Sequence, residues 1–187
     1  MVVDPAVAES LRGGERTRIA AFVASCTERM AQLFTGLRGV DPSRAEDVEL
    51  YLETLEDLWS LDLADSVFAV RMETLRELPE LQPSEEGLVD VADIYAFYGV
   101  LCIRYAVLYR ANGDAEDAVR CAHASLTALG QLDRNVPQAA FFQVEHEQQR
   151  QMMLGDTSIS GPLLGLRDGD REISRERLLT VNSRLRK

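Results

Sequence analysis

The most apolar stretch of the chain, IYAFYGVLCIRYAVLY at 94–109, contains a single charged residue, Arg104. A helix needs about 20 apolar residues to cross a bilayer, and this stretch has 16. Asp90 and Asp114 flank it, whereas membrane spans usually carry arginine or lysine on their cytoplasmic side. A helix that is apolar on nearly every side is typical of the middle of a bundle. The stretch therefore predicts one central helix, over about residues 90–112.

Apolar residues elsewhere recur at spacings of three and four, the pattern of one buried helical face. Such segments lie at about 15–36, 43–60, 63–78, 114–133 and 137–154. Together with the central helix they predict an all-α fold, a compact antiparallel bundle of about six to seven helices.

Several residues mark where these helices begin and end. Ser43 and Glu46 have the spacing of a capping box, in which each side chain bonds the other's backbone N–H. Gly113 suits a left-handed C-terminal stop, and Asp114 suits the N-cap of the next helix. Pro137 fits the first turn of the helix that follows it.

A length of 187 residues fits one globular domain. Residues 15–154 carry the helical pattern and predict that single domain. Residues 1–14 are small and polar and end in two glycines, which predicts a flexible lead-in. Residues 155–187 predict a polar, basic tail with a short helix at Arg175–Leu185.

The chain has a net charge of −11, and the charge is uneven. Residues 155–187 carry +2, so the preceding 154 residues carry −13. Such an acidic body repels phosphate backbones and anionic lipid head groups, so neither nucleic acid nor a membrane is expected as a partner. It favours a basic protein partner, although many helical proteins are acidic for solubility alone.

Three cysteines, Cys26, Cys102 and Cys121, form no C-x-x-C pair and leave an odd count. This usage fits a reducing compartment better than a disulfide scaffold. The first residues lack a basic stretch followed by an apolar run and a cleavage site. A cytoplasmic location is therefore predicted, with the cysteines packed as small apolar residues in the core.

No pattern of catalytic or metal-binding residues is present. His146-Glu147 begins like a zinc-protease motif, but Arg150 stands where the second histidine belongs. Neither His123 nor His146 has the preceding glutamate of a di-iron bundle. Serine nucleophile and phosphate-loop motifs are also absent from the sequence. The sequence thus predicts a protein that is not an enzyme, with no cofactor and no metal.

Two sets of residues are candidates for binding. The acidic residues Glu49, Glu53, Glu56 and Asp57 share one face of a predicted helix and suggest a surface for a basic partner. The alternative is a pocket for an anionic small molecule, or a lyase-type site, in the bundle near Arg104. Its lining would be Tyr95, Tyr98, Arg104 and Tyr105.

A homodimer is a third alternative, because leucines in the tail offer an apolar surface to a neighbour. These leucines are Leu163, Leu164, Leu178 and Leu179.

The order of segments resembles the YjaG-like family of small bacterial all-α proteins, a domain of unknown function. The resembling segments are RIAAFVASCTERMAQLF at 18–34, LYLETLEDLW at 50–59, ETLRELPELQPSEEGLVDVADIYAFYGVL at 73–101 and AEDAVRCAHASL at 115–126. The resemblance implies a helical fold and transfers no site. A small acidic helical protein without catalytic motifs suggests an interaction module, such as an immunity protein that neutralises a basic toxin.

Overall fold

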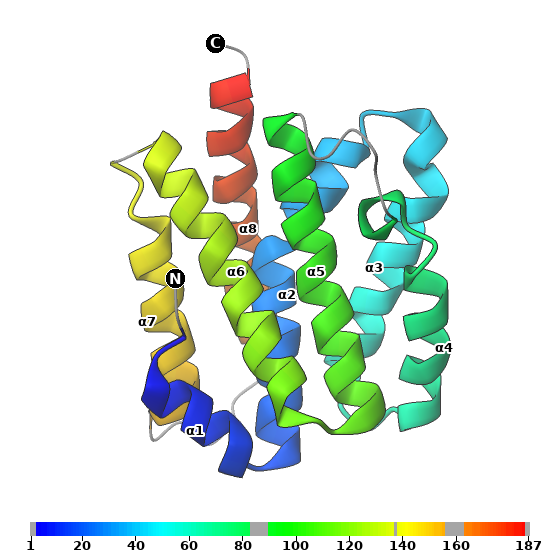
Figure 1. Cartoon of the computed structure of the whole chain (residues 1–187), viewed down its shortest axis with the longest axis vertical. Helices are drawn as coiled ribbons and strands as arrows, with labels where there is room; N and C mark the ends of the chain where they lie inside the picture. Colours follow the sequence, from blue (N-terminus) through cyan, green and yellow to red (C-terminus); the bar gives the residue numbers. More distant parts are fainter. Residues whose placement is uncertain (1–2, 83–89, 137, 156–162, 186–187) are drawn as a thin grey trace.

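The computed structural model describes residues 3–82, 90–136, 138–155 and 163–185. These residues form eight α-helices and two short 3₁₀ helices and contain no β-strand, so the predicted all-α bundle is confirmed (Figure 1). The helices are α1 (Pro5–Gly13), α2 (Arg16–Arg38), η1 (Pro42–Arg44), α3 (Ala45–Trp59), α4 (Asp65–Leu75), η2 (Pro79–Leu81), α5 (Val91–Asn112), α6 (Ala115–Asn135), α7 (Phe141–Leu154) and α8 (Leu163–Leu185).

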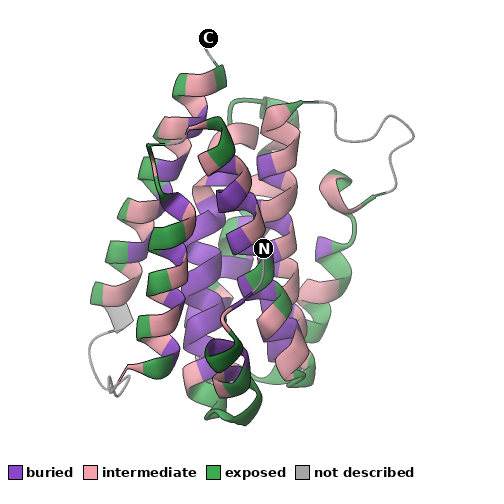
Figure 2. Cartoon of the chain, turned by 60° about the vertical axis from the view of Figure 1, so that its left-hand side comes forward, coloured by how far each residue is buried: buried purple, intermediate pink, exposed green. Residues whose placement is uncertain are grey.

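Two helices, α2 and α5, form the centre of the bundle. Helix α5 packs against α2, α4 and α6, as predicted for the apolar stretch, while α2 also packs against α3 and α8. Every residue from Ile19 to Ala31 in α2 is buried, and Figure 2 shows the buried residues concentrated in the central ribbons. Helix α2, although it is less apolar than α5, is thus the central helix that is covered on all sides over these residues.

Helix α5 has a half-buried stripe along its outer face, where Tyr98, Leu101 and Tyr105 lie. In length and hydropathy it is the one helix among the described residues that could span a membrane, a property that the core helices of bundles share. Its packing against three neighbouring helices makes it a core helix of this bundle.

Gly99 sets the distance between the two central helices. A β-carbon at this position would lie 3.1 Å from Cβ of Phe34 on α2. Tyr51 of α3 stacks on Phe34, with ring centroids 4.9 Å apart, and its hydroxyl donates to the carbonyl oxygen of Gly99 at 3.2 Å. Three helices therefore meet at a residue without a side chain.

Two of the predicted helix boundaries, at Gly113 and Asp114, are confirmed. Asp90 accepts a bond from the backbone N–H of Ala92 and caps α5, which ends at Gly113 with a left-handed φ of 72°. Asp114 caps α6 by accepting from the N–H of Glu116. These are the bonds that free backbone groups at helix ends require.

Two predicted helix starts are wrong. Ser43 donates its N–H and its hydroxyl to Asp41, which starts the one-turn helix η1, so the capping box with Glu46 does not form. The helix expected from Pro137, which lies outside the described residues, begins only at Phe141 as α7. Its free N–H groups are capped by Asp133 of α6, a partner distant enough in sequence to escape local patterns.

The predicted flexible lead-in over 1–14 is wrong for residues 5–13, which form α1. Asp4 caps this helix, and Val7 and Leu11 are buried against the bundle. Ser10 donates its hydroxyl to the carbonyl oxygen of Met153 at 3.0 Å. The apolar residues of this short helix are too few to stand out from its polar ones.

The tail of 155–187 was predicted to hold only a short helix, but α8 begins at Leu163 and has 23 residues. It packs along α2. Its inward positions include Asp170, Ser174 and Arg177, which are all buried. These polar residues interrupt the apolar spacing of α8, and the sequence pattern therefore missed most of this helix.

Arg110 is the buried arginine of α5, whereas Arg104 is half-buried on the outer stripe. The guanidinium of Arg110 donates to the carbonyl oxygens of Leu58 at 3.0 Å and Ser60 at 3.2 Å, where α3 ends. It also lies over the ring of Phe68, 4.1 Å from the centroid. Arg110 thus joins α5 to the end of α3 and to α4.

An ion-pair cluster at the end of α2 offers a test of how charge stabilises the fold. Glu80 of η2 accepts from Nε of Arg38 at 2.7 Å and from Nη2 of Arg44 at 2.7 Å, and its side chain is 3% exposed. Burial opposes ionisation of Glu80, but the bonds from Arg44 and Arg38 outweigh it and lower the pKa of this carboxyl.

Replacing Glu80 with glutamine is expected to lower the unfolding free energy by about 2 kcal/mol at pH 7. The stabilisation from a carboxyl with a lowered folded pKa is complete above its unfolded pKa, about 4.3, and disappears as the pH falls through the folded pKa. The difference between wild type and Glu80→Gln should therefore shrink as urea unfolding is repeated from pH 5 to pH 3.

The matched control is Glu73→Gln, which removes an ion pair to Arg76 from a side chain that is 61% exposed. We expect it to change the unfolding free energy by less than about 0.5 kcal/mol. A Glu80→Gln difference that stays constant from pH 5 to pH 3 would contradict the assignment of the effect to the Glu80 charge.

Candidate functional site

A surface groove runs along α3 beside the end of α2 and encloses about 570 Å³. We call it the α3 groove. Its apolar residues are Pro42, Ala45, Val48 and Leu52, and its acidic residues are Asp41, Glu49, Glu53 and Glu56, with Gly39 at the end of α2. Apolar and acidic side chains therefore alternate along one open surface.

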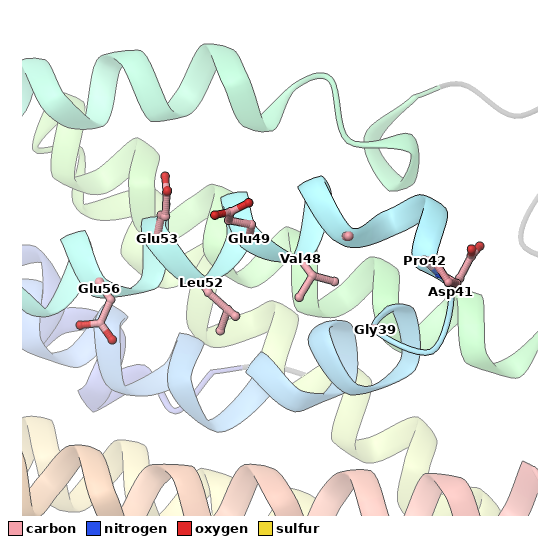
Figure 3. A pocket seen from close by; sticks show the side chains of 9 residues that line it. Gly39, Asp41, Pro42, Val48, Glu49, Leu52, Glu53 and Glu56 are labelled. Atoms are coloured by element: carbon pink, nitrogen blue, oxygen red, sulfur yellow. The ribbon is translucent and has the colours of Figure 1, made fainter.

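The groove exists because α3 has a wider apolar stripe than the bundle covers. Tyr51, Leu55 and Leu58 of the apolar segment at 43–60 are buried, but Leu52 of the same segment is 45% exposed. In Figure 3, Val48 and Leu52 point from α3 toward the ribbon of α2, and Glu53 points to the opposite side. The exposed Leu52 and the half-buried Val48 thus form an apolar part of the groove beside its carboxylates.

Three of the four predicted partner-binding residues line this groove, namely Glu49, Glu53 and Glu56. Glu53 also pairs with Arg71 of α4 at 2.9 Å, and Glu56 accepts from Nη1 of Arg167 at 2.8 Å. Asp57 lies outside the groove and pairs with Arg71 at 2.7 Å. Their spacing in the sequence grouped these glutamates on one helix face, but it did not indicate the arginines of α4 and α8 that pair with Glu53 and Glu56.

A second hollow, between α1, α5 and α6, encloses about 440 Å³. We call it the α1–α6 pocket. Its lining residues are Val3, Pro5, Ala8, Arg12, Tyr98, Leu101, Tyr105, Val119, Arg120, His123, Ala124 and Thr127. Most of this surface is apolar, and the cationic and hydroxyl groups come from all three helices.

Of the four predicted pocket residues, Tyr98 and Tyr105 line the α1–α6 pocket together. Tyr95 is buried elsewhere, and its hydroxyl accepts from Asn135 at 3.2 Å. Arg104 is half-buried and is not among the residues that line the pocket. Tyr98 and Tyr105 lie together because they are seven residues apart and share a face of α5. Arg104 lies about 100° away from Tyr105 around the helix.

A buried cluster of four charged side chains joins α2, α7 and α8. Arg29 donates to both carboxylate oxygens of Glu145, at 2.7 and 2.8 Å, and to Asp170 at 3.0 Å. Arg177 donates to Glu145 at 2.8 Å and to the carbonyl oxygen of Arg29 at 2.9 Å. None of the four side chains is more than 2% exposed. We call this group the buried ion cluster.

The charges in this cluster balance, with two arginines and two carboxylates. Burial opposes ionisation of Glu145, but attraction to Arg29 and Arg177 outweighs it and holds the pKa of Glu145 well below its usual range. Burial raises the pKa of Asp170, which Arg29 only partly offsets. The Glu145 oxygens accept bonds from the two arginines and from Gln149 at 3.0 Å, so this carboxylate joins α7 to α2 and α8.

Sequence reasoning missed the buried ion cluster. Arg29 sits between Cys26 and Met30 on the buried face of α2, which was a signal that its charge needs a partner. Its partners Glu145 and Asp170 lie more than 100 residues further along the chain, so no spacing within one helix identifies them.

The three cysteines are free and buried, as predicted. The sulfur atoms of Cys102 and Cys121 are 3.8 Å apart, and burial raises the pKa of Cys26. A raised thiol pKa lowers the fraction of reactive thiolate. Within the described ranges, no group of three or more histidine, cysteine, aspartate or glutamate side chains is arranged to hold a metal ion.

Of the four leucines suggested for a homodimer, the structure describes the side chains of two, Leu178 and Leu179. Leu179 is 70% exposed, whereas Leu178 packs against Gly36 of α2. The side chains of Leu163 and Leu164 lie outside the described residues.

No family model, no characterised protein and no solved structure matches this chain. The resemblance to the YjaG-like family therefore stays a prediction.

Proposed function

We propose that the protein is a non-enzymatic interaction module that binds a basic, partly apolar segment of another protein in the α3 groove. The observation that carries this proposal is that the exposed Leu52 and the half-buried Val48 line one groove together with Glu49, Glu53 and Glu56. Apolar contacts would supply affinity, because each buried Å² of apolar surface contributes about 25 cal/mol. The carboxylates would select a basic partner over an acidic one.

The finer role that we propose is that of an immunity-type protein that neutralises a basic toxin. The −13 charge of residues 1–154 supports it, because an acidic field speeds the approach of a basic partner. An acidic helix face would also occupy a toxin site that otherwise holds phosphates. The cytoplasmic location that the cysteines suggest would place such a protein where a toxin acts.

The first test uses a synthetic helical peptide with leucine on one face and lysine on the other, and stopped-flow fluorescence to measure its association. Reversing three charges in the groove, Glu49→Lys, Glu53→Lys and Glu56→Lys, is expected to slow association by about tenfold or more and to flatten its salt dependence. The control reverses Glu9, Glu147 and Glu176, which are exposed and lie away from the groove, and so changes the net charge equally.

A second variant separates the groove from the general field. Leu52→Ser keeps every charge and removes an apolar side chain that is already 45% exposed, so the fold should tolerate it. We expect about tenfold faster dissociation of the peptide, equivalent to about 1.4 kcal/mol, with an unchanged association rate. Equal slowing by the groove and control triple variants, together with unchanged dissociation from Leu52→Ser, would refute the groove as the binding surface.

A further inference from the structure

We propose that the α1–α6 pocket is a binding site for a small organic anion with an aromatic body. The site is separate from the α3 groove and does not depend on the function proposed there. Ligand pockets commonly enclose about 300–1,000 Å³ and are mostly apolar with a few converging polar groups. The 440 Å³ and the lining of this pocket fit that description.

Apart from Val3, which precedes α1, the pocket is built by regular helix faces. Tyr98, Leu101 and Tyr105 have the i, i+3, i+7 spacing that places three side chains on one face of α5. Pro5, Ala8 and Arg12 have the same spacing on α1. Helix α1 packs against α6 and α7. The face of α1 that lines the pocket is therefore held in place beside the outer stripe of α5.

The polar groups of the pocket favour an anion. None of its lining residues is acidic, whereas Arg12, Arg120 and His123 are basic. Arg12 pairs with Glu116 through Nε at 2.6 Å, and Arg120 pairs with Asp117 through Nη1 at 2.7 Å. A guanidinium has five N–H groups, so each arginine keeps donors that can bind a ligand carboxylate without breaking its ion pair.

The rest of the lining favours an aromatic body on that anion. Leu101, Val119 and Ala124 provide apolar surface, and the rings of Tyr98 and Tyr105 lie among them. Flat aromatic groups pack well against tyrosine rings and helix faces. A carboxylate at the rim beside the arginines and an aryl group over the apolar residues would therefore match both parts of the pocket.

The test compares three probes of one shape, 2-naphthoate, 2-naphthamide and 2-naphthylmethylammonium, by ligand-observed NMR titration of the full chain. We expect 2-naphthoate to bind at least about tenfold more tightly than the ammonium probe, with the amide between them. Equal binding of all three probes, or no binding of 2-naphthoate at millimolar concentration, would overturn the proposal.

Two variants then locate the binding. Arg120→Gln is expected to weaken 2-naphthoate about tenfold and to leave the amide unchanged. Its control is Arg76→Gln, because Arg76 is equally exposed and forms the same i, i+3 pair with an acidic residue outside the pocket. Val119→Trp should fill the pocket and abolish binding of all probes while circular dichroism stays unchanged. Equal weakening by Arg76→Gln, or full binding by a folded Val119→Trp variant, would overturn the assignment of the site.

Discussion

Replacing Glu145 with glutamine is expected to lower the unfolding free energy by about 3–5 kcal/mol, the cost of leaving a buried charge without its partner. The substitution keeps the size of the side chain and removes the one carboxylate among the described residues that pairs with both Arg29 and Arg177. The buried ion cluster would then hold two positive charges and one negative charge. Equilibrium urea unfolding at pH 7 measures the loss.

The control for this variant is Glu147→Gln on the same helix, where the side chain is exposed. We expect it to change the unfolding free energy by less than about 0.5 kcal/mol. Losses of the same size for both variants would mean that the charge of Glu145 is not what stabilises the cluster.

A second substitution tests the charge balance directly. Arg177→Met alone leaves two carboxylates with one arginine, and it should also be destabilising. Combined with Glu145→Gln, it leaves Arg29 paired with Asp170 at 3.0 Å and restores neutrality. The double variant should therefore be more stable than the sum of the two single losses predicts, by about 1–3 kcal/mol. Additive losses would contradict the coupling.

Much of the fold could be predicted from the sequence because apolar side chains dominate most helix contacts. The stretch at 94–109 predicted α5 and its place in the bundle. Gly113 and Asp114 predicted the turn between α5 and α6, since these residue types bond the backbone locally. Such local signals do not depend on knowing the partner helix.

The parts that escaped prediction are those that polar side chains hold together. Helix α8 docks through Asp170, Ser174 and Arg177, and its partners belong to α2 and α7. A polar residue in a sequence suggests exposure to solvent unless its partner is known. Those partners are distant in the sequence. The sequence pattern therefore indicated a polar tail with a short helix, although α8 packs on the core.

The candidate sites were partly predictable for the same reason. Residue spacing correctly grouped Glu49, Glu53 and Glu56, and also Tyr98 with Tyr105, because each group shares a face of one helix. Spacing could not show that Leu52 stays at the surface or that Arg12 of α1 closes a pocket over α5 and α6. Both depend on how much of a helix face its neighbours cover.

Replacing Gly99 with valine is expected to lower the unfolding free energy by about 3 kcal/mol, at the upper end of what overpacking a core usually costs. The new β-carbon would lie 3.1 Å from Cβ and 3.4 Å from the backbone nitrogen of Phe34. Neither atom belongs to the mobile end of a side chain, so α5 and α2 would have to separate. Gly99→Ala should cost less, because alanine regains about 1 kcal/mol of helix propensity.

The control for both variants is Gly169→Ala in α8, where an added β-carbon meets no atom within 4 Å. Here only the helix propensity changes, and we expect the unfolding free energy to rise by about 0.5–1 kcal/mol. Urea unfolding of the three variants compares glycine at a helix crossing with glycine on an open helix face. A Gly99→Val variant as stable as wild type would contradict the close packing of α5 on α2. It would also contradict the helix positions that shape the outer stripe of α5 and the α1–α6 pocket.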